Sequence, residues 1–131
     1  MPRFAKSLFG QVVIALVLAF RTNTAYNRFW EGRTLWGALV NASRNFTRQV
    51  QTWVAAPPDA APDAARDLAV LALRRELVRH VIGFAHALRQ RLRDQHAPDE
   101  YAPLLDPALL ARLAGEPNRP QAILAHVAAR L

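Results

Sequence analysis

The sequence predicts an all-α protein, and three observations support this class. Apolar residues recur at spacings of three and four through most of the chain, as on one face of a helix. No stretch alternates as a strand would, and no internal repeat is present. Helix start and stop signals flank the periodic segments. At 131 residues the chain has room for one domain, which we expect to cover residues 1–131.

The first element is an apolar helix with fourteen uncharged residues from Ser7 to Phe20. It spans about 21 Å at about 1.5 Å per residue, whereas a full membrane crossing needs about 20 residues. Three interpretations are open: a signal peptide cleaved after Ala19, a buried core helix, or a membrane bundle helix completed by its partners. Because helical periodicity continues past Phe20, where a signal peptide would end in a polar, extended segment, the third interpretation is favoured.

The next helix is expected over residues 22–54. Its aromatic side chains are interleaved with arginines near the start, as at the boundary between a bilayer and water. Its apolar face is formed by Leu35, Leu39, Ala42, Phe46, Val50 and Trp53. The sequence Ala55-Ala56-Pro57-Pro58 ends the helix, because proline cannot continue it.

Three more helices are expected after a solvated linker at residues 55–66. A long helix over residues 64–94 should pair with helix 22–54 as an antiparallel hairpin. Its apolar face is formed by Val70, Leu73, Leu77, Val81, Phe84, Leu88 and Leu92. Two short helices fill residues 106–131. The first is capped by Asp106, starts at Pro107 and is closed by Gly115, and the second begins near Pro120.

The charge is concentrated in the first third of the chain. Residues 1–54 hold seven Lys or Arg and one acid, a net charge of +6, whereas residues 55–131 hold ten Arg and nine acids, a net charge of +1. A basic element of this kind suits nucleic acid or the cytoplasmic flank of a membrane segment. The adjoining apolar helix favours the membrane.

Several kinds of chemistry are excluded or disfavoured. The absence of cysteine excludes disulfides and thiol chemistry. We expect no enzyme, because the sequence has no Gly-rich phosphate loop, no nucleophile motif and no plausible pair of carboxylates. The histidines show no metal-ligand spacing with nearby carboxylates, and His80 and His86 fall on different helix faces. We therefore expect no metal and no cofactor.

A pattern of arginine, asparagine and aromatic residues lies between Ala19 and Arg48. It consists of Phe20-Arg21-Thr22-Asn23, Ala25-Tyr26, Arg28, Glu31, Arg33, Leu35-Trp36-Gly37 and Ser43-Arg44. A later block reads Phe84-Ala85-His86-Ala87-Leu88-Arg89. Together these segments resemble the bacterial bestrophin-like ion channel family.

The resemblance implies a pentameric channel in the bacterial inner membrane that conducts ions passively. Residues 1–21 would form the pore-neck helix, and residues 22–131 would be cytoplasmic. The neck would be lined by Val12, Leu16 and Phe20, which fall on one helix face. Five copies give three apolar rings, which gate by dewetting. The implied partners are sister subunits, membrane lipid and a permeating ion, with chloride the default because the basic first third attracts anions. Nucleic acid is not implied.

Family members carry a membrane hairpin before the neck and further membrane helices later, so the resemblance implies an incomplete subunit. The motif residues are expected to have structural roles; they are Arg21, Asn23, Tyr26, Arg28, Glu31, Arg33, Trp36, Gly37 and Arg44. Arg28 and Glu31, three residues apart on a helix, are interpreted as an ion pair and not as an acid–base pair. Two alternatives remain: a soluble basic helical module that binds nucleic acid or a partner protein, and a secreted helical protein.

Overall fold

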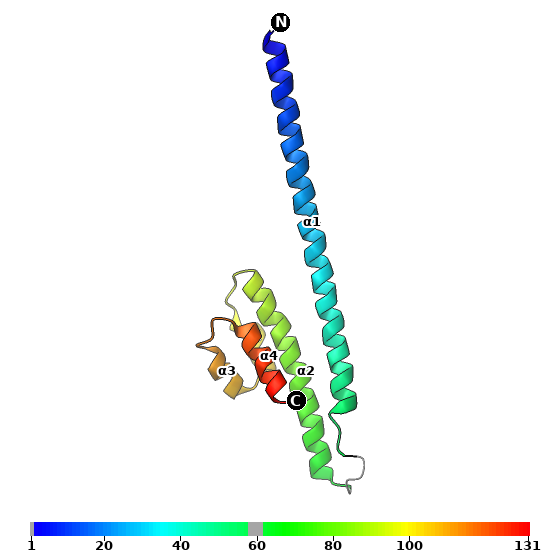
Figure 1. Cartoon of the computed structure of the whole chain (residues 1–131). Helices are drawn as coiled ribbons and strands as arrows, with labels where there is room; N and C mark the ends of the chain where they lie inside the picture. The colour runs from blue at the N-terminus through cyan, green and yellow to red at the C-terminus, as the bar shows by residue number, and fades with distance from the viewer. Residues whose placement is uncertain (1, 58–61) are drawn as a thin grey trace. The chain divides into compact units, whose positions relative to one another are not determined.

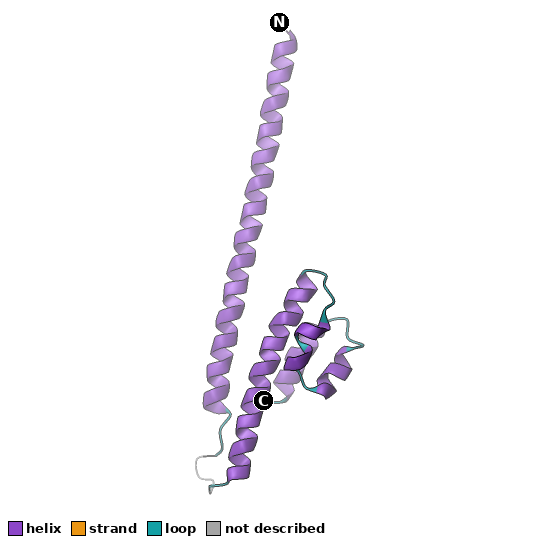
Figure 2. Cartoon of the chain, turned by 180° about the vertical axis from the view of Figure 1, so that it is seen from behind, coloured by secondary structure: helices purple, strands orange, loops and turns teal. Residues whose placement is uncertain are grey.

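The structure is a computed structural model that describes residues 2–57 and 62–131, with side chains described from residue 8 onward. Its helices are α1 (Pro2–Trp53), α2 (Ala64–Leu92), α3 (Pro107–Leu113) and α4 (Arg119–Ala129), with two 3₁₀ helices, η1 (Pro98–Glu100) and η2 (Ala102–Leu104), between α2 and α3. No strand occurs in the described ranges (Figure 2). The predicted all-α class is confirmed. The chain divides into two compact units, Met1–Asn41 and Ala42–Leu131.

Helix α1 runs without a break through the expected boundary at residues 21 and 22 (Figure 1). This continuity agrees with the periodicity that disfavoured a signal peptide. Within the helix, the hydroxyl groups of Thr24 and Thr34 donate to the carbonyls of Phe20 and Trp30, each at 2.9 Å. These side chains therefore satisfy their own hydrogen bonds on the helix surface.

Helix α2 begins and ends at identifiable caps. The Asp63 carboxylate accepts a hydrogen bond from the N–H of Ala65 at 2.9 Å, which makes Asp63 the N-cap. The helix ends at Leu92, two residues before the predicted end, because Asp94 takes a φ of 53°. A left-handed residue cannot continue a right-handed helix, and aspartate tolerates this conformation better than most residues.

In the unit Ala42–Leu131, the last turns of α1 pack beside α2. Val50 is buried in a cluster with Leu77 and Val81 of α2 and Val127 of α4. The Arg74 side chain donates through Nε to the carbonyl of Val54 at 2.7 Å, just after the end of α1. In this unit the predicted hairpin is therefore packed only at the last turns of α1. Trp53 and Leu92, expected on the packed faces, are exposed.

A second cluster joins α2 to the elements that follow it. Its buried members are Ala87, Tyr101, Leu105, Leu109, Leu113 and Ile123. Gly83 of α2 permits this close approach, because a Cβ there would lie 2.7 Å from Cδ2 of Leu105. Such a distance is too short for two carbon atoms. The glycine thus sets how near η2 and the following residue can come to α2.

The short helices follow the predicted signals with small shifts. The Asp106 carboxylate caps α3 by accepting from the N–H of Ala108 at 3.4 Å, and Pro107 is the first helical residue. Helix α3 ends at Leu113, two residues before Gly115. Helix α4 begins at Arg119, with Asn118 as its cap, close to the predicted start at Pro120.

Candidate functional site

Helix α1 contains the apolar segment that could interact with a membrane. From Leu8 onward it includes a stretch long and apolar enough to cross a bilayer by length and composition, and none of that stretch is buried. The helix of a soluble core would be mostly buried. Side chains all round the segment are apolar and exposed, including Leu8, Phe9, Val13, Ile14, Val17 and Leu18. A helix that is apolar on every side requires an apolar environment on every side.

The three predicted neck residues lie along this apolar segment. Val12, Leu16 and Phe20 are 58%, 55% and 64% exposed. Residues four apart differ by about 40° around a helix, so the three side chains form one slowly turning stripe. Within the unit Met1–Asn41, no described side chain is buried against this stripe.

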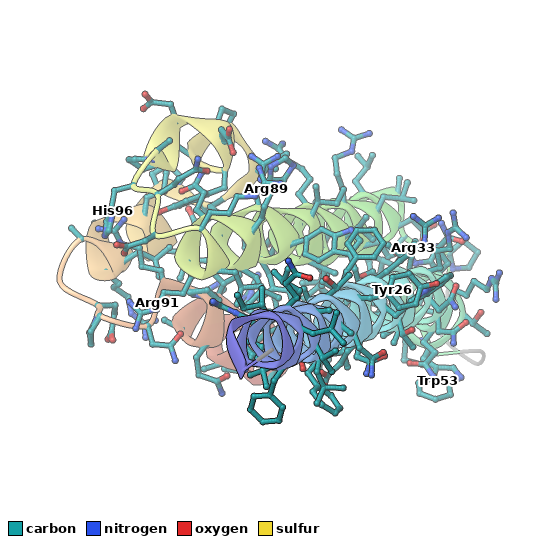
Figure 3. The ribbon with its side chains drawn as sticks, turned by 90° about the horizontal axis from the view of Figure 1, so that it is seen from above. Tyr26, Arg33, Trp53, Arg89, Arg91 and His96 are labelled. Atoms are coloured by element: carbon teal, nitrogen blue, oxygen red, sulfur yellow. The ribbon has the colours of Figure 1, made fainter. Side chains whose placement is uncertain are left out.

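The predicted motif residues follow on the same helix, and all of them are exposed: Arg21, Asn23, Tyr26, Arg28, Glu31, Arg33, Trp36, Gly37 and Arg44. Tyr26 contacts Trp30 edge to face, with ring centroids 6.2 Å apart. Tyr26 and Arg33 are labelled in Figure 3. The expected ion pair between Arg28 and Glu31 is not formed in the described part of the chain. A Cβ placed on Gly37 would meet nothing within 4 Å.

A different group of polar side chains meets between α2 and α4. His80 is 1% exposed, and its ring lies 5.3 Å from the ring of His126. Nε2 of His80 accepts a hydrogen bond from the N–H of Asp106 at 3.2 Å. Nδ1 of His80 and Nε2 of His126 are both buried without a hydrogen-bond partner among the described residues. Glu76 lies one turn before His80 on α2, within reach of both rings.

Burial favours the neutral form of His80. Burial lowers the pKa of His80 most, and the neighbouring His126 and Arg79 lower it further. The carboxylates of Glu76 and Asp106 act in the opposite direction without reversing the shift. Glu76 is itself held by Arg130, whose Nε and one terminal nitrogen donate to its two oxygens, each at 3.1 Å. This guanidinium–carboxylate pair joins the C-terminal end of α4 to α2.

Sequence reasoning missed this histidine and carboxylate group. Glu76 and His80 are four residues apart on one helix, a spacing that was visible. His126 comes from α4, and only the packing of α4 on α2 brings it near. The expectation that no histidine has a metal-ligand spacing with a carboxylate is therefore wrong for His80.

A third polar group fastens the loop that follows α2. Gln90 is buried; its Nε2 donates to the carbonyl of Ala97 at 2.6 Å and to the Glu100 carboxylate at 3.0 Å, and its Oε1 accepts from the N–H of Ala97 at 3.3 Å. Arg89 forms an ion pair with the same carboxylate. The hydrogen bond from Gln90 is the main reason that the pKa of Glu100 is lowered, and Arg89 adds to the effect.

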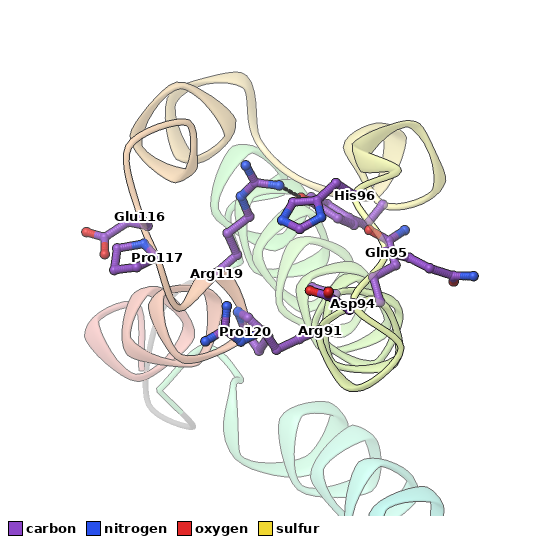
Figure 4. A pocket seen from close by; sticks show the side chains of 11 residues that line it. Arg91, Asp94, Gln95, His96, Glu116, Pro117, Arg119 and Pro120 are labelled. Carbon is purple, nitrogen blue, oxygen red and sulfur yellow. Dashed lines mark hydrogen bonds between the residues drawn. The ribbon is translucent and has the colours of Figure 1, made fainter.

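A hollow of about 270 Å³ opens beside this loop (Figure 4). Its lining includes the cations Arg91 and Arg119 and the acids Asp94 and Glu116. Arg119 reaches the hydroxyl of the buried Tyr101 at 3.4 Å, the contact dashed in Figure 4. Because the opposite charges are evenly mixed, the lining selects no particular class of ligand.

The chain is similar in sequence to known proteins. Residues 2–131 match the family described as Bacterial/Fungal Bestrophin protein. A voltage-dependent anion channel-forming protein of Nostoc sp. (strain PCC 7120) is 36% identical over 114 residues, which are 87% of this chain and 34% of the relative. Its counterpart in Ralstonia nicotianae is 35% identical over 118 residues, 90% of this chain and 35% of the relative.

A third relative, the voltage-dependent anion channel-forming protein YneE of Escherichia coli K12, is 43% identical over 84 residues, 64% of this chain and 23% of the relative. The chain thus spans about a third of the length of the first of these curated relatives. No solved structure matches it. Since the family match extends over nearly every residue, the chain belongs to the bacterial and fungal bestrophin family.

Proposed function

We propose that this chain is the neck-forming and cytoplasmic part of an anion channel subunit in a bacterial membrane. The observation that carries the proposal is the family match over residues 2–131 together with relatives named as voltage-dependent anion channel-forming proteins. The exposed apolar segment of α1 supports it, because such a surface is suited to lipid and to other subunits. A channel conducts passively and needs no catalytic group.

The proposed pore is a ring of five α1 helices. Val12, Leu16 and Phe20 of each copy face the axis and form three apolar rings. An apolar constriction holds water poorly, so it passes ions only when it is wetted. The remaining apolar side chains of the segment face lipid or the membrane helices of the assembly.

The basic stretch after the neck supplies the preference for anions, with chloride as the ion. Arg21 directly follows Phe20, and Arg28 and Arg33 come later on the same helix. Glu31 is the one acidic residue in residues 1–54. A positive surface at the pore entrance raises the local anion concentration. It also agrees with a cytoplasmic position for residues 22–131, since cytoplasmic flanks are enriched in Lys and Arg.

The test is a bilayer recording of the complete gene product that carries this chain. In an asymmetric KCl gradient we expect a reversal potential near the chloride equilibrium potential. A reversal near the potassium potential would refute the anion preference, and the absence of any current from a correctly assembled oligomer would refute the channel.

A matched pair of variants tests the neck assignment. Leu16→Ala should raise the open probability or the conductance, because a smaller side chain widens and wets the ring. Leu18→Ala removes the same group from a residue about 200° away around the helix, so it should leave the current unchanged. Equal effects of the two substitutions would remove Leu16 from the pore.

A further inference from the structure

We propose that Glu76, His80 and His126 form a binding site for one divalent transition-metal ion, with Zn²⁺ as the best match. One candidate ligand atom from each of these three residues lies within 4.8 Å of the other two. The residues come from two helices that are packed together in one compact unit, α2 and α4. This inference does not depend on the channel proposal, because it uses only the unit Ala42–Leu131.

Two buried nitrogens point to a missing partner at this place. Nδ1 of His80 and Nε2 of His126 have no hydrogen-bond partner among the described residues, although both atoms are shielded from solvent. A buried polar atom without a hydrogen-bond partner destabilises the folded chain. A metal ion bound to both nitrogens supplies the missing partner and explains why two imidazoles adjoin in a buried place.

The donor set fits zinc chemistry. Two imidazoles and one carboxylate are a common set of three protein ligands for Zn²⁺, with a fourth position left for water or another ligand. Ligands of a tetrahedral ion with bonds of about 2.0 Å lie about 3.3 Å apart. The three atoms therefore have to approach one another by up to about 1.5 Å, which rotation of the half-buried Glu76 and His126 side chains can supply.

Binding at Nδ1 of His80 requires one local change. Because Nε2 accepts the N–H of Asp106, the neutral ring carries its proton on Nδ1. A metal ion at Nδ1 shifts the proton to Nε2, and the hydrogen bond to Asp106 is then lost. That bond is long, at 3.2 Å, and it connects α2 to the N-cap of α3. Metal binding is thus expected to loosen the start of α3 while it fastens α4 to α2.

Arg130 orients the carboxylate without blocking it. Its two nitrogens use one lone pair on each oxygen of Glu76, and each oxygen retains another for a metal ion. Ligating carboxylates are often held by such outer hydrogen bonds. The guanidinium charge opposes a cation, so we expect moderate affinity and not that of a permanent structural zinc.

The test is a calorimetric titration of the full chain in detergent with ZnCl₂. We expect one ion per chain, with the dissociation constant raised at least about tenfold by His80→Gln, His126→Gln or Glu76→Gln. The matched control is His96→Gln, which alters an exposed histidine outside the cluster and should change the constant less than about twofold. Equal weakening by His96→Gln, or unchanged binding by the three cluster variants, would overturn the proposal.

A measurement on the unmodified chain covers the case in which the variants fail to fold. Zinc X-ray absorption of the 1:1 complex should show two imidazole ligands and oxygen in the remaining positions. Fewer than two imidazoles, or no stoichiometric binding at all, would refute the site. Channel current plays no part in either measurement, so failure of the metal site and failure of the channel are distinguishable.

Discussion

The two units of this chain differ in how their apolar side chains are buried. In Met1–Asn41, no described side chain is buried, and its large apolar side chains are exposed apart from the half-buried Leu39. In Ala42–Leu131, two apolar clusters are buried by helices of the same chain. The second unit carries its own core, whereas the described apolar side chains of the first are left uncovered by the chain itself, and under the proposed function lipid or other subunits cover them. This contrast explains why one continuous helix has two kinds of surface.

The largest effect is expected from a substitution in the buried core of the second unit. Leu77 is fully buried in the cluster of Val50, Val81 and Val127, so Leu77→Ala should lower the free energy of unfolding by about 2–5 kcal/mol. Leu35→Ala removes the same atoms from an exposed position of α1 and should cost less than about 1 kcal/mol. Urea denaturation in detergent, followed by circular dichroism, measures both. Equal losses would contradict the contrast between the units.

A smaller effect comes from adding one methyl group to a glycine in each unit. Gly83→Ala should destabilise the chain by about 1–3 kcal/mol, because its Cβ would meet Leu105 at 2.7 Å. Gly37→Ala meets no atom within 4 Å and should stabilise α1 by up to about 1 kcal/mol. Thermal melts of the two variants give the comparison. If Gly37→Ala also reduces channel current, the space beside Gly37 is filled by another subunit.

The smallest effect concerns pH and the loop that Gln90 holds. The pKa of Glu100 is lowered from its ordinary 4.5 by the hydrogen bond from Gln90 and by Arg89. A carboxyl with a lowered folded-state pKa stabilises the fold above its unfolded pKa, and this contribution disappears as the pH falls through the folded value. Stability should therefore fall below about pH 4.5, and Glu100→Gln should flatten that part of the curve. Melting temperatures measured between about pH 3 and pH 7 test this expectation. If the melting temperature of the Glu100→Gln variant fell with pH as steeply as that of the unmodified chain, the role of Glu100 would be contradicted.

The sequence predicted the local features of the fold better than the contacts made over long distances. Helix periodicity and the predicted cap at Asp106 depend on neighbouring residues, and α2, α3 and α4 lie within a few residues of their predicted bounds. The caps at Asp63 and Asn118 were not predicted. The neck and motif residues were found on one continuous exposed helix, but their roles depend on copies of the chain and stay predictions. Nothing in the local pattern indicated η1 and η2.

The polar contacts that the sequence did not predict depend on tertiary packing. His126 meets His80 only because α4 lies on α2, and no spacing rule connects residues so far apart. Gln90 reads as an ordinary polar residue on a helix, yet it is buried because the loop folds back over it. Both cases concern polar groups whose partners are distant in sequence, and apolar periodicity carries no information about such partners.

The hydrogen bond from Arg74 to the carbonyl of Val54 has a consequence for evolution of the linker. This hydrogen bond holds the end of α1 against the side of α2, and it does not depend on the number of residues between the two helices. Each doubling of loop length costs only about 0.6 kcal/mol in closure entropy. Homologues should therefore accept insertions and deletions between Pro57 and Asp63, while an arginine or another long donor persists at the position of Arg74.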